Sequence, residues 1–276
     1  MVTGSPSLKE SPLLWIKDYV HREYGLYFSE RKMFTLESKL KRRVYQLELD
    51  SIEEYAEYFR GNPDEVPFFL DTVTTNKTDF FRELPHWHYF EQELIPAWQD
   101  KKEIRIWSAA CSSGEEPYTA GLLLEREKRK SRYDIPPYRI LASDISEEVL
   151  RQGTRAVYPD KSLEPVRKYD PSLSSDFFHR DQQTNYRLDD SVKENVFFRQ
   201  FNLKFKNRPF RKKFHLIMVR NVLIYFDQAM IQNVISNCER LLVDKGILMI
   251  SHTETLQGID HDLNQVKTSI FQKSEG

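Results

Sequence analysis

Residues 104–116 have the sequence IRIWSAACSSGEE, and this stretch decides the fold class. Its apolar first half, 104–109, predicts a short buried strand that ends in small residues, and a helix pattern follows from Glu116 to about Lys130. The same order returns at 138–144, a predicted strand that ends in an acid, after which Ser146 is placed to cap a further helix. Strands that alternate with helices predict an α/β fold with a parallel, doubly wound sheet.

Later strands of this sheet are predicted at 196–201, 214–219 and 246–250. Residues 158–195 interrupt the alternation, because they are polar and irregular and contain short β-like pieces at 176–179 and 185–188. We interpret this segment as an inserted subdomain that lies outside the main sheet.

The N-terminal part of the chain has a different pattern, with helices and no strand signal. Ser29 is placed to cap a helix in which Met33, Leu36 and Leu40 lie on one face, and Ser51 is placed to cap a shorter one. We therefore expect a small helical domain over residues 1–72 and a sheet domain over 73–276, the latter with its insertion at about 158–195.

Composition excludes several classes of protein. The 276 residues carry a formal net charge of −1, with 39% hydrophobic and 30% charged residues, so a soluble globular protein is expected rather than one drawn as a whole to nucleic acid or acidic membranes. The two cysteines are too few for a disulfide framework and fit a reducing compartment. The start, MVTGSPSLKE, shows no secretory signal, and no run approaches the roughly 18 apolar residues of a membrane span, so we expect a cytoplasmic protein.

The turn after the first strand is the first candidate binding element. It has a single glycine, Gly114, and two acids, Glu115 and Glu116, where a dinucleotide-binding loop would hold a pyrophosphate. This favours a ligand with positive charge, such as S-adenosylmethionine with its sulfonium and ammonium groups. An ordinary tight strand-to-helix turn is the alternative.

Two further strand ends carry polar residues. Asp144 ends the second strand, where a carboxylate can accept both ribose hydroxyls of a nucleoside cofactor, although a helix cap is the alternative. Arg220 and Asn221 interrupt an apolar run, which is costly unless they are paired, so we expect them to have a task; a structural ion pair or helix cap would also satisfy them.

The segment 74–83, TTNKTDFFRE, joins the helical part to the sheet part. Its polar cluster is expected to fold over a bound ligand with Arg82 near the reacting end. The alternative is a capped turn with two core phenylalanines.

Four motifs in this order, TTNKTDFFRE, WSAACSSGEEPYT, ILASDISEEVL and VRNVLIYFD, resemble those of the CheR family of chemotaxis receptor methyltransferases, and the resemblance extends into GLYFSERKMFTLESKLKRR near the N-terminus. It implies a helical N-terminal domain and a class I methyltransferase domain with an inserted antiparallel β-subdomain. It also implies that the cofactor is S-adenosyl-L-methionine, which leaves as S-adenosyl-L-homocysteine. The implied reaction is protein-glutamate O-methylation, which forms γ-methyl esters on the cytoplasmic helices of methyl-accepting chemoreceptors for sensory adaptation.

The resemblance also assigns roles to single residues. Arg82 and Tyr225 would lie at the methyl-transfer site. The expected cofactor contacts are Asn76, Thr78, Arg82, Glu115, Asp144, Asn202, Leu203, Arg220 and Asn221. The segment 251–254 reads SHTE where the family has Gly-His-Ser-Glu, so it is given no role. The turn at 181–184 looks shorter than in members that bind a receptor's C-terminal pentapeptide, so we expect a pentapeptide-independent enzyme.

A glutamate carboxylate is already a nucleophile at neutral pH, so no general base is expected, and Arg82 and Tyr225 would orient the substrate carboxylate. The helix between Glu30 and Leu47 is basic and would dock glutamate-rich receptor helices through Lys39, Arg42 and Arg43. An ordinary solvated helix face is the alternative for that helix.

Other chemistry is not expected. His86 and His88 have no further ligands at a metal-site spacing, so no metal is predicted, and Cys111 has no identifiable catalytic histidine. We expect a monomer. Competing hypotheses are the same fold acting on a nucleic acid or small molecule, a non-catalytic signalling module that binds S-adenosylmethionine, and a family enzyme of a non-flagellar chemosensory pathway.

Overall fold

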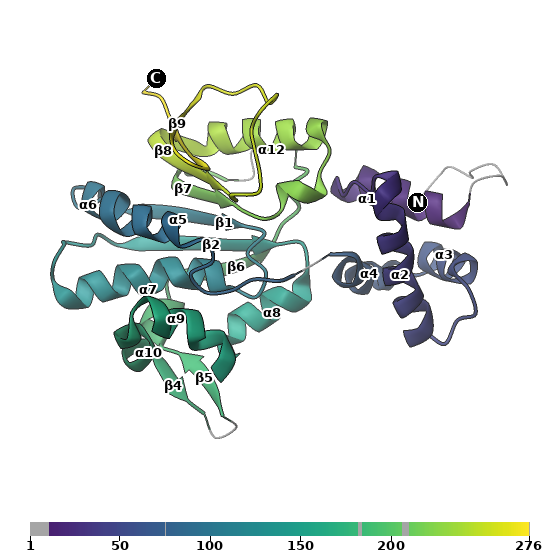
Figure 1. The fold of residues 1–276 in the computed structure, drawn as a ribbon, viewed down its shortest axis with the longest axis horizontal. Helices are drawn as coiled ribbons and strands as arrows, with labels where there is room; N and C mark the ends of the chain where they lie inside the picture. The colour runs from purple at the N-terminus through teal and green to yellow at the C-terminus, as the bar shows by residue number, and fades with distance from the viewer. Residues whose placement is uncertain (1–10, 75, 182–183, 206–209, 276) are drawn as a thin grey trace. The chain divides into compact units, whose positions relative to one another are not determined.

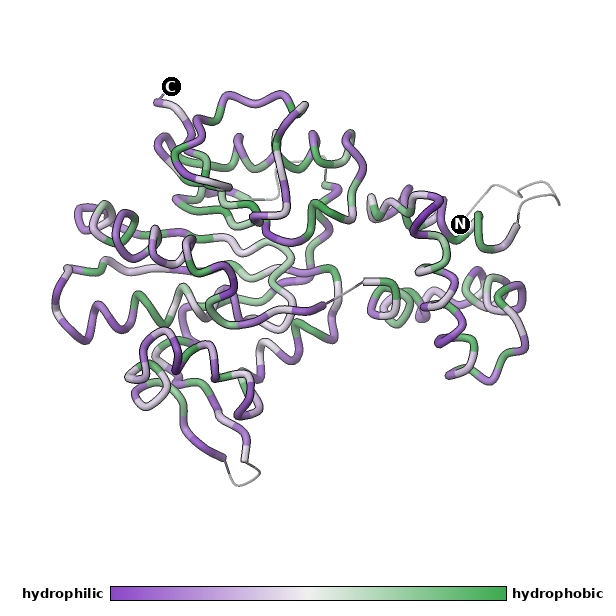
Figure 2. Tube along the Cα trace, viewed as in Figure 1, coloured by the Kyte–Doolittle hydropathy of each residue, from purple (hydrophilic) through white to green (hydrophobic). Residues whose placement is uncertain are grey.

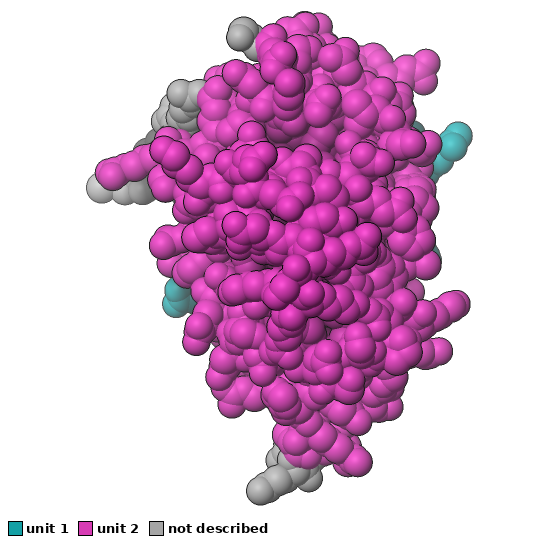
Figure 3. Space-filling view, turned by 90° about the vertical axis from the view of Figure 1, so that its left-hand side faces the viewer, with its two compact units in different colours: residues 1–75, 225–230 teal, residues 76–224, 231–276 magenta. Residues whose placement is uncertain are grey.

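A computed structural model describes residues 11–74, 76–181, 184–205 and 210–275. The chain forms two compact units, shown in two colours in Figure 3. The first comprises residues 1–75 together with 225–230, and the second comprises residues 76–224 together with 231–276.

Over residues 11–74, the first unit is built from four α-helices and a short 3-10 helix. The bounds are α1 (Pro12–Tyr24), α2 (Glu30–Gln46), α3 (Ile52–Gly61), η1 (Pro63–Glu65) and α4 (Val66–Val73). Gly25 ends α1 in a left-handed conformation. The Ser51 hydroxyl accepts a bond from Glu54 N at the start of α3, as predicted. Ser29 precedes α2 as expected, but its hydroxyl accepts no capping bond from the helix, so that part of the prediction was wrong. The apolar faces meet in a core that includes Ile16, Leu36 and Leu40.

Residues 225–230 also belong to this unit and pair with the segment after α1. Tyr27 N donates to Tyr225 O across 2.8 Å, and Leu26 forms an isolated β-bridge with Phe226. Asp227 accepts a bond from Met230 N and so caps α12 (Gln228–Leu241). Figure 2 shows hydrophobic and hydrophilic residues alternating along α12, the pattern of a helix with one buried face.

The second unit contains a seven-stranded sheet of order β6-β2-β1-β7-β8-β10-β9. Its strands are β1 (Ile104–Ala109), β2 (Tyr138–Asp144), β6 (Val196–Gln200), β7 (Phe214–Val219), β8 (Leu242–Ile250), β9 (Leu263–Lys267) and β10 (Ile270–Lys273). The strands from β6 to β8 pair in parallel, and β10 and β9 add an antiparallel edge. Helices α7 (Glu115–Lys130) and α8 (Glu147–Arg155) lie on the opposite side of the strands from α12 (Figure 1).

An antiparallel sheet of order β3-β5-β4 forms the inserted part. Its strands are β3 (Val157–Pro159), β4 (Phe178–Arg180) and β5 (Asn185–Leu188), and its helices are η3 (Asp160–Leu163), α9 (Glu164–Tyr169), α10 (Pro171–Phe177) and α11 (Asp190–Lys193). The strand predicted at 176–179 was partly wrong, because Asp176 belongs to α10. The prediction about the turn at 181–184 falls on residues 182–183, which lie outside the described residues.

These features confirm the predicted fold class: a doubly wound, mostly parallel sheet, an all-α N-terminal part and an inserted antiparallel sheet. Several elements were not predicted. They include the run of α5 (Leu84–Tyr89), the π-helix η2 (Phe90–Leu94) and α6 (Ile95–Ala97), the helices α9, α10 and α11 of the inserted part, and the β9–β10 hairpin. Among the described residues, no helix is long and apolar enough to cross a bilayer.

Candidate functional site

The carboxyl ends of the five parallel strands meet at one edge of the sheet. From β1 the chain proceeds to β2 and β6 on one side, and then crosses to β7 and β8 on the other, so β1 and β7 flank the switch point where ligands bind in such sheets. The residues that follow or end these strands there are Ala110–Glu115, Asp144, Asn202, Arg220–Asn221 and Ser251.

The loop after β1 turns sharply through left-handed positions. Ala110, Ser112 and Gly114 all have positive φ, and a Cβ at Gly114 would come within 2.9 Å of the Phe198 ring. Ser112 Oγ donates to Asn76 O across 2.8 Å, so this loop is tied to the segment that enters the second unit.

Asp144 connects this loop to the next strand. Its Oδ2 accepts from Ser112 N at 2.9 Å and its Oδ1 accepts from Ser146 N at 3.0 Å. The cap of α8 is the hydroxyl of Ser146, which accepts from Val149 N. Phe201 N donates to Asp144 O, which brings Asn202 and Leu203 next to the end of β2. Each carboxylate oxygen has a second lone pair in principle, so the geometry leaves Asp144 chemically able to accept further donors.

Glu115, at the first turn of α7, gives the edge an acidic character. Its side chain is buried, and Ser113 Oγ donates to its Oε2 at 2.8 Å. Burial raises the pKa of Glu115 to about 7, and the nearby charge of Asp79 adds to the rise while the bond from Ser113 opposes it. A cationic ligand would favour the ionised carboxylate.

Cys111 lies in the same acidic surroundings. Burial raises the pKa of its thiol well above the usual value, and the charges of Asp144 and Glu116 act in the same direction. The thiolate is the nucleophilic form of cysteine, so the site does not favour a cysteine nucleophile.

Arg220, just after β7, is held by two carboxylates. Its side chain is 1% exposed, its Nη1 donates to Glu116 Oε2 at 2.8 Å, and its Nη2 lies 3.2 Å from Glu83 Oε2. Nη2 also donates to Arg82 O at 2.6 Å. The ion pair considered for Arg220 from the sequence is therefore present, with Glu83 and Glu116 as its partners. A separate hydrogen bond connects Arg220 to the backbone carbonyl of Arg82.

Asn221 has a positive φ of 60°, and its side chain donates to Ser251 Oγ at 2.6 Å. Its backbone N–H and that of Leu223 donate to the two carboxylate oxygens of Glu254. The 251–254 segment, which had no role in the sequence-based interpretation, thus shapes the turn after β7.

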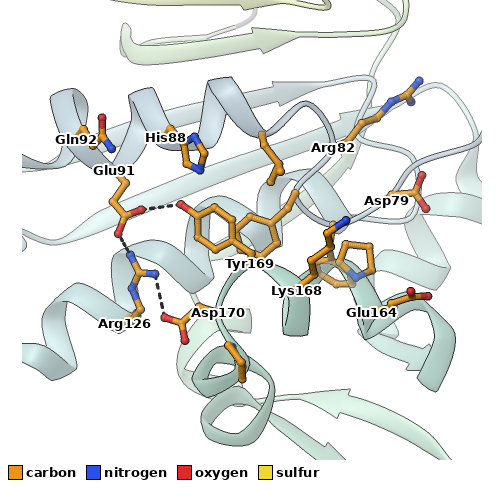
Figure 4. Close-up of a pocket in the computed structure, with 15 residues that line it drawn as sticks. Asp79, Arg82, His88, Glu91, Gln92, Arg126, Glu164, Lys168, Tyr169 and Asp170 are labelled. Carbon is orange, nitrogen blue, oxygen red and sulfur yellow. Dashed lines mark hydrogen bonds and ion pairs between the residues drawn. The ribbon is translucent and has the colours of Figure 1, made fainter.

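Arg82 borders a groove with a volume of about 960 Å³ (Figure 4). Phe81 and Tyr169 stack in this groove with ring centroids 4.1 Å apart, and Arg126 bridges Glu91 and Asp170. Figure 4 shows the Arg82 side chain directed away from Tyr169; its Nη1 donates to Lys77 O at 3.0 Å.

Hydrogen bonds connect the expected cofactor residues into two sets. Asn76 and Asp144 form one set and are connected through Ser112. Arg82, Arg220 and Asn221 form the other set and are connected around Glu83. Thr78 is half-buried in the same entering segment as Asn76. Sequence reasoning gave no role to four residues that connect these sets: Ser112, Glu83, Ser251 and Glu254. It named Glu116 as an acid for a cationic ligand, whereas in the structure Glu116 pairs with Arg220. Glu83 and Glu116 stand inside the quoted motifs, and the signal was a carboxylate able to neutralise the buried Arg220.

Tyr225 belongs to the first unit, where it lines a small pocket of about 180 Å³. Lys32, Thr35 and Lys39 line the same pocket. The residue predicted to orient the substrate and one residue predicted to dock it therefore share one pocket of that unit.

The three predicted docking residues on α2 differ in their surroundings. Lys39 Nζ donates to Val73 O at 2.8 Å and to Thr74 O at 3.0 Å, and burial lowers its pKa. Arg43 makes a two-pronged pair with Glu65 at 2.6 and 2.7 Å. Arg42 is exposed. Lys39 and Arg43 thus have structural tasks within the unit.

Glu83, His86 and His252 are the described residues that place possible metal ligands close together, within 4.8 Å of one another. The guanidinium of Arg220 lies 3.2 Å from the Glu83 carboxylate and would repel a metal ion there. Burial, followed by the charge of Arg220, lowers the pKa of His86 to about 3, so the ring is neutral.

The carboxylates at the sheet edge suit S-adenosylmethionine chemically, because a carboxylate such as Asp144 can accept hydroxyl donors and one such as Glu115 attracts a positively charged group. Comparison with known proteins agrees. The model of the CheR methyltransferase SAM-binding domain matches residues 76–271, and that of the CheR methyltransferase all-alpha domain matches residues 12–74.

Relatives match over nearly the whole chain. The chemotaxis protein methyltransferase of Borreliella burgdorferi is 31% identical over 263 residues, which cover 92% of this chain and 91% of that protein. Chemotaxis protein methyltransferase 2 of Pseudomonas aeruginosa is 31% identical, covering 93% and 90%, and the Escherichia coli chemotaxis protein methyltransferase is 28% identical, covering 94% and 89%. The chain therefore belongs to the CheR family of S-adenosylmethionine-dependent methyltransferases.

Proposed function

We propose that this enzyme methylates glutamate side chains on the cytoplasmic helices of chemoreceptors and forms γ-methyl esters. The observation that carries the proposal is the acidic strand-end edge, where Asp144 and Glu115 stand beside the switch point in a chain that matches the CheR models from residue 12 to residue 271. Relatives named chemotaxis protein methyltransferases support a role in sensory adaptation.

The proposed reaction needs no proton transfer by a protein side chain. S-adenosylmethionine supplies an electrophilic methyl group, and a glutamate carboxylate is ionised at neutral pH, so no general base is needed. The side chains instead hold the carboxylate in line and exclude water. We assign the orientation of the substrate carboxylate to Arg82 and Tyr225. The cofactor contacts that we propose are Asn76, Thr78, Arg82, Glu115, Asp144, Asn202, Leu203, Arg220 and Asn221.

We place receptor docking on the exposed face of α2. Phe34 and Tyr45 are 79% and 84% exposed there, and since they are 11 residues apart they lie on one helix face, with Lys41 and Arg42 between them. Exposed aromatic and basic side chains suit an amphipathic, glutamate-rich helix. Arg42 would steer the acidic helix directly, whereas Lys39 and Arg43 support the helix from within the unit.

We further propose that the enzyme acts as a cytoplasmic monomer without a receptor pentapeptide. The buried free thiols Cys111 and Cys238 fit a reducing compartment, and receptor methylation helices lie in the cytoplasm.

The proposal is tested by incubating the enzyme with methyl-labelled S-adenosylmethionine and receptor-containing membranes of the source organism. We expect label on receptor-sized bands that mild base releases as methanol, which identifies a carboxyl ester. Label in nucleic acid, or cofactor binding without transfer, would contradict it and point to the alternative substrates or to a non-catalytic module.

A further inference from the structure

Arg82 stands between two backbone positions that side chains other than glycine rarely adopt. Phe81 has a φ of 55° and Glu83 a φ of 62°. Such conformations cost free energy and persist where the surroundings hold them firmly, which happens most often at functional sites. The contacts that hold Phe81 and Glu83 in these conformations therefore also determine the position of Arg82 between them.

Phe81 is held on the side of the groove. Its backbone N–H donates to Thr119 Oγ1 at 3.2 Å, and its ring is 3% exposed and stacked on Tyr169. This anchor fixes the chain directly before Arg82.

Glu83 is held from the other side by residues far away in the chain. Its Oε1 accepts from Ser251 Oγ at 2.7 Å and faces Asn221 Nδ2 at 3.4 Å. Its Oε2 accepts from His252 N at 3.2 Å and pairs with Arg220 Nη2 at 3.2 Å. Burial alone would raise the pKa of Glu83, but the bond from Ser251 and the charge of Arg220 outweigh it and bring the pKa to about 2. The side chain is therefore a fixed anion at neutral pH.

Arg220 links this anion to the backbone of Arg82. The same Nη2 that pairs with Glu83 donates to Arg82 O at 2.6 Å, while Nη1 is held by Glu116. Trp87 Nε1 also donates to Arg82 O, at 3.0 Å. The carbonyl of Arg82 is thus held by Trp87 and by Arg220, and the guanidinium of Arg220 is itself paired with the Glu83 carboxylate.

We propose that Glu83 is a positioning residue: its carboxylate, together with Arg220, fixes the strained backbone that presents the Arg82 guanidinium to the cofactor. This rests on the role proposed for Arg82 at the cofactor. Glu83 itself touches neither substrate nor cofactor in this account. A purely structural Glu83 would instead affect stability without any dependence on the Arg82 side chain.

A double-mutant cycle on cofactor affinity separates these possibilities. S-adenosylhomocysteine binding is measured by calorimetry on the full chain for Glu83→Gln, Arg82→Ala and the double variant. Glu83→Gln keeps the size of the side chain and removes its charge. We expect it to weaken binding about tenfold in the wild-type background and less than about twofold when Arg82 is already alanine.

An equal loss in both backgrounds would overturn the proposal, because Glu83 would then act independently of Arg82. If Arg82→Ala alone leaves affinity unchanged, both the role of Arg82 and the proposal fail, while receptor labelling still tests the proposed function separately. Glu125→Gln is the matched control, since Glu125 is a buried carboxylate on α7 that accepts a hydrogen bond from the hydroxyl of Tyr138. It should lower the melting temperature and leave the affinity unchanged in either background.

If Glu83→Gln does not fold, Glu83→Asp replaces it. This change keeps the charge but shortens the side chain by one methylene, which weakens the bonds of the carboxylate to Ser251 and Arg220. We expect a smaller loss of affinity that again disappears in the Arg82→Ala background, and an undiminished loss there would overturn the proposal.

Discussion

The backbone N–H of Ser112 donates to the carboxylate of Asp144 across 2.9 Å, which ties the loop after β1 to the end of β2. The conformation of this loop therefore depends on Asp144 accepting this bond. Because we propose Asp144 as a cofactor contact, the proposed cofactor site and the local fold depend on the same carboxylate.

Asp144→Ala should weaken binding of S-adenosylmethionine by about 100-fold and also lower the melting temperature, because the N–H groups of Ser112 and Ser146 both lose their acceptor. Asp144→Asn keeps one acceptor oxygen and should lose affinity with less loss of stability. Calorimetry and thermal melts measure both. Asp134→Asn, at an exposed position before β2, is the control. Full affinity in Asp144→Ala would remove this residue from the site.

We expect Glu115 to make cofactor uptake depend on pH. Its pKa is raised by burial from 4.5 to about 7, so the folded protein without cofactor holds a proton on Glu115 between these values that the unfolded chain has lost. The contribution of Glu115 to stability therefore falls as pH rises through that window. Cofactor affinity should rise over the pH range around 7, because the ionised carboxylate attracts the cationic ligand. Calorimetry against pH should show this rise in the wild type and a flat profile in Glu115→Gln; equal profiles would contradict it.

Arg43 is expected to stabilise the helical unit rather than to meet the receptor directly. Its side chain is 14% exposed and that of Glu65 only 2%, so Arg43→Ala leaves a buried carboxylate with the Tyr55 hydroxyl but without its cationic partner. The loss should be about 3 kcal/mol of unfolding free energy. Chemical denaturation followed by circular dichroism measures it, with exposed Lys41→Ala as the control. A loss no larger than in that control would show that the pair contributes little.

The docking face of α2 is testable without disturbing this pair. Arg31 is exposed on α2, three residues before Phe34, and so extends this face. Arg31→Glu with Arg42→Glu reverses two exposed charges and should slow receptor methylation at low salt by about tenfold, with little effect at high salt. Lys102→Glu with Arg132→Glu makes the same change of charge at exposed positions in the second unit. Equal rates for the two double variants would exclude docking on this face.

Tyr225→Phe tests the orientation of the substrate. Loss of one hydroxyl should lower kcat by about tenfold while the affinity for S-adenosylhomocysteine stays nearly constant, since the predicted role concerns the carboxylate alone. Steady-state methylation and calorimetry provide the two values. An unaltered kcat would remove Tyr225 from the mechanism.

The elements that could be predicted are those with a strong local pattern. β1, β2 and β7 have the predicted bounds because each is an apolar run closed by small or polar residues. The β9–β10 hairpin was missed because β9 has the polar sequence LNQVK and is mostly exposed at the sheet edge, so no apolar alternation marks it.

In the candidate site, too, some residues could be predicted from a local sequence pattern and others depend on the tertiary fold. Asp144 and Arg220 stand out as polar residues at the ends of apolar strands. The bond between Glu83 and Ser251 joins positions 168 residues apart, and its existence depends on how β8 folds back beside β7. No local pattern carries that information, so the positioning network became visible only in three dimensions.

The most direct test of the account is mass spectrometry of a purified chemoreceptor cytoplasmic domain after incubation with the enzyme and S-adenosylmethionine. The account predicts single methyl additions on glutamates of the receptor helices with wild-type enzyme, removal of these additions by mild base, and almost none with Asp144→Ala. Methyl groups on other residue types, or unchanged modification with Asp144→Ala, would contradict it.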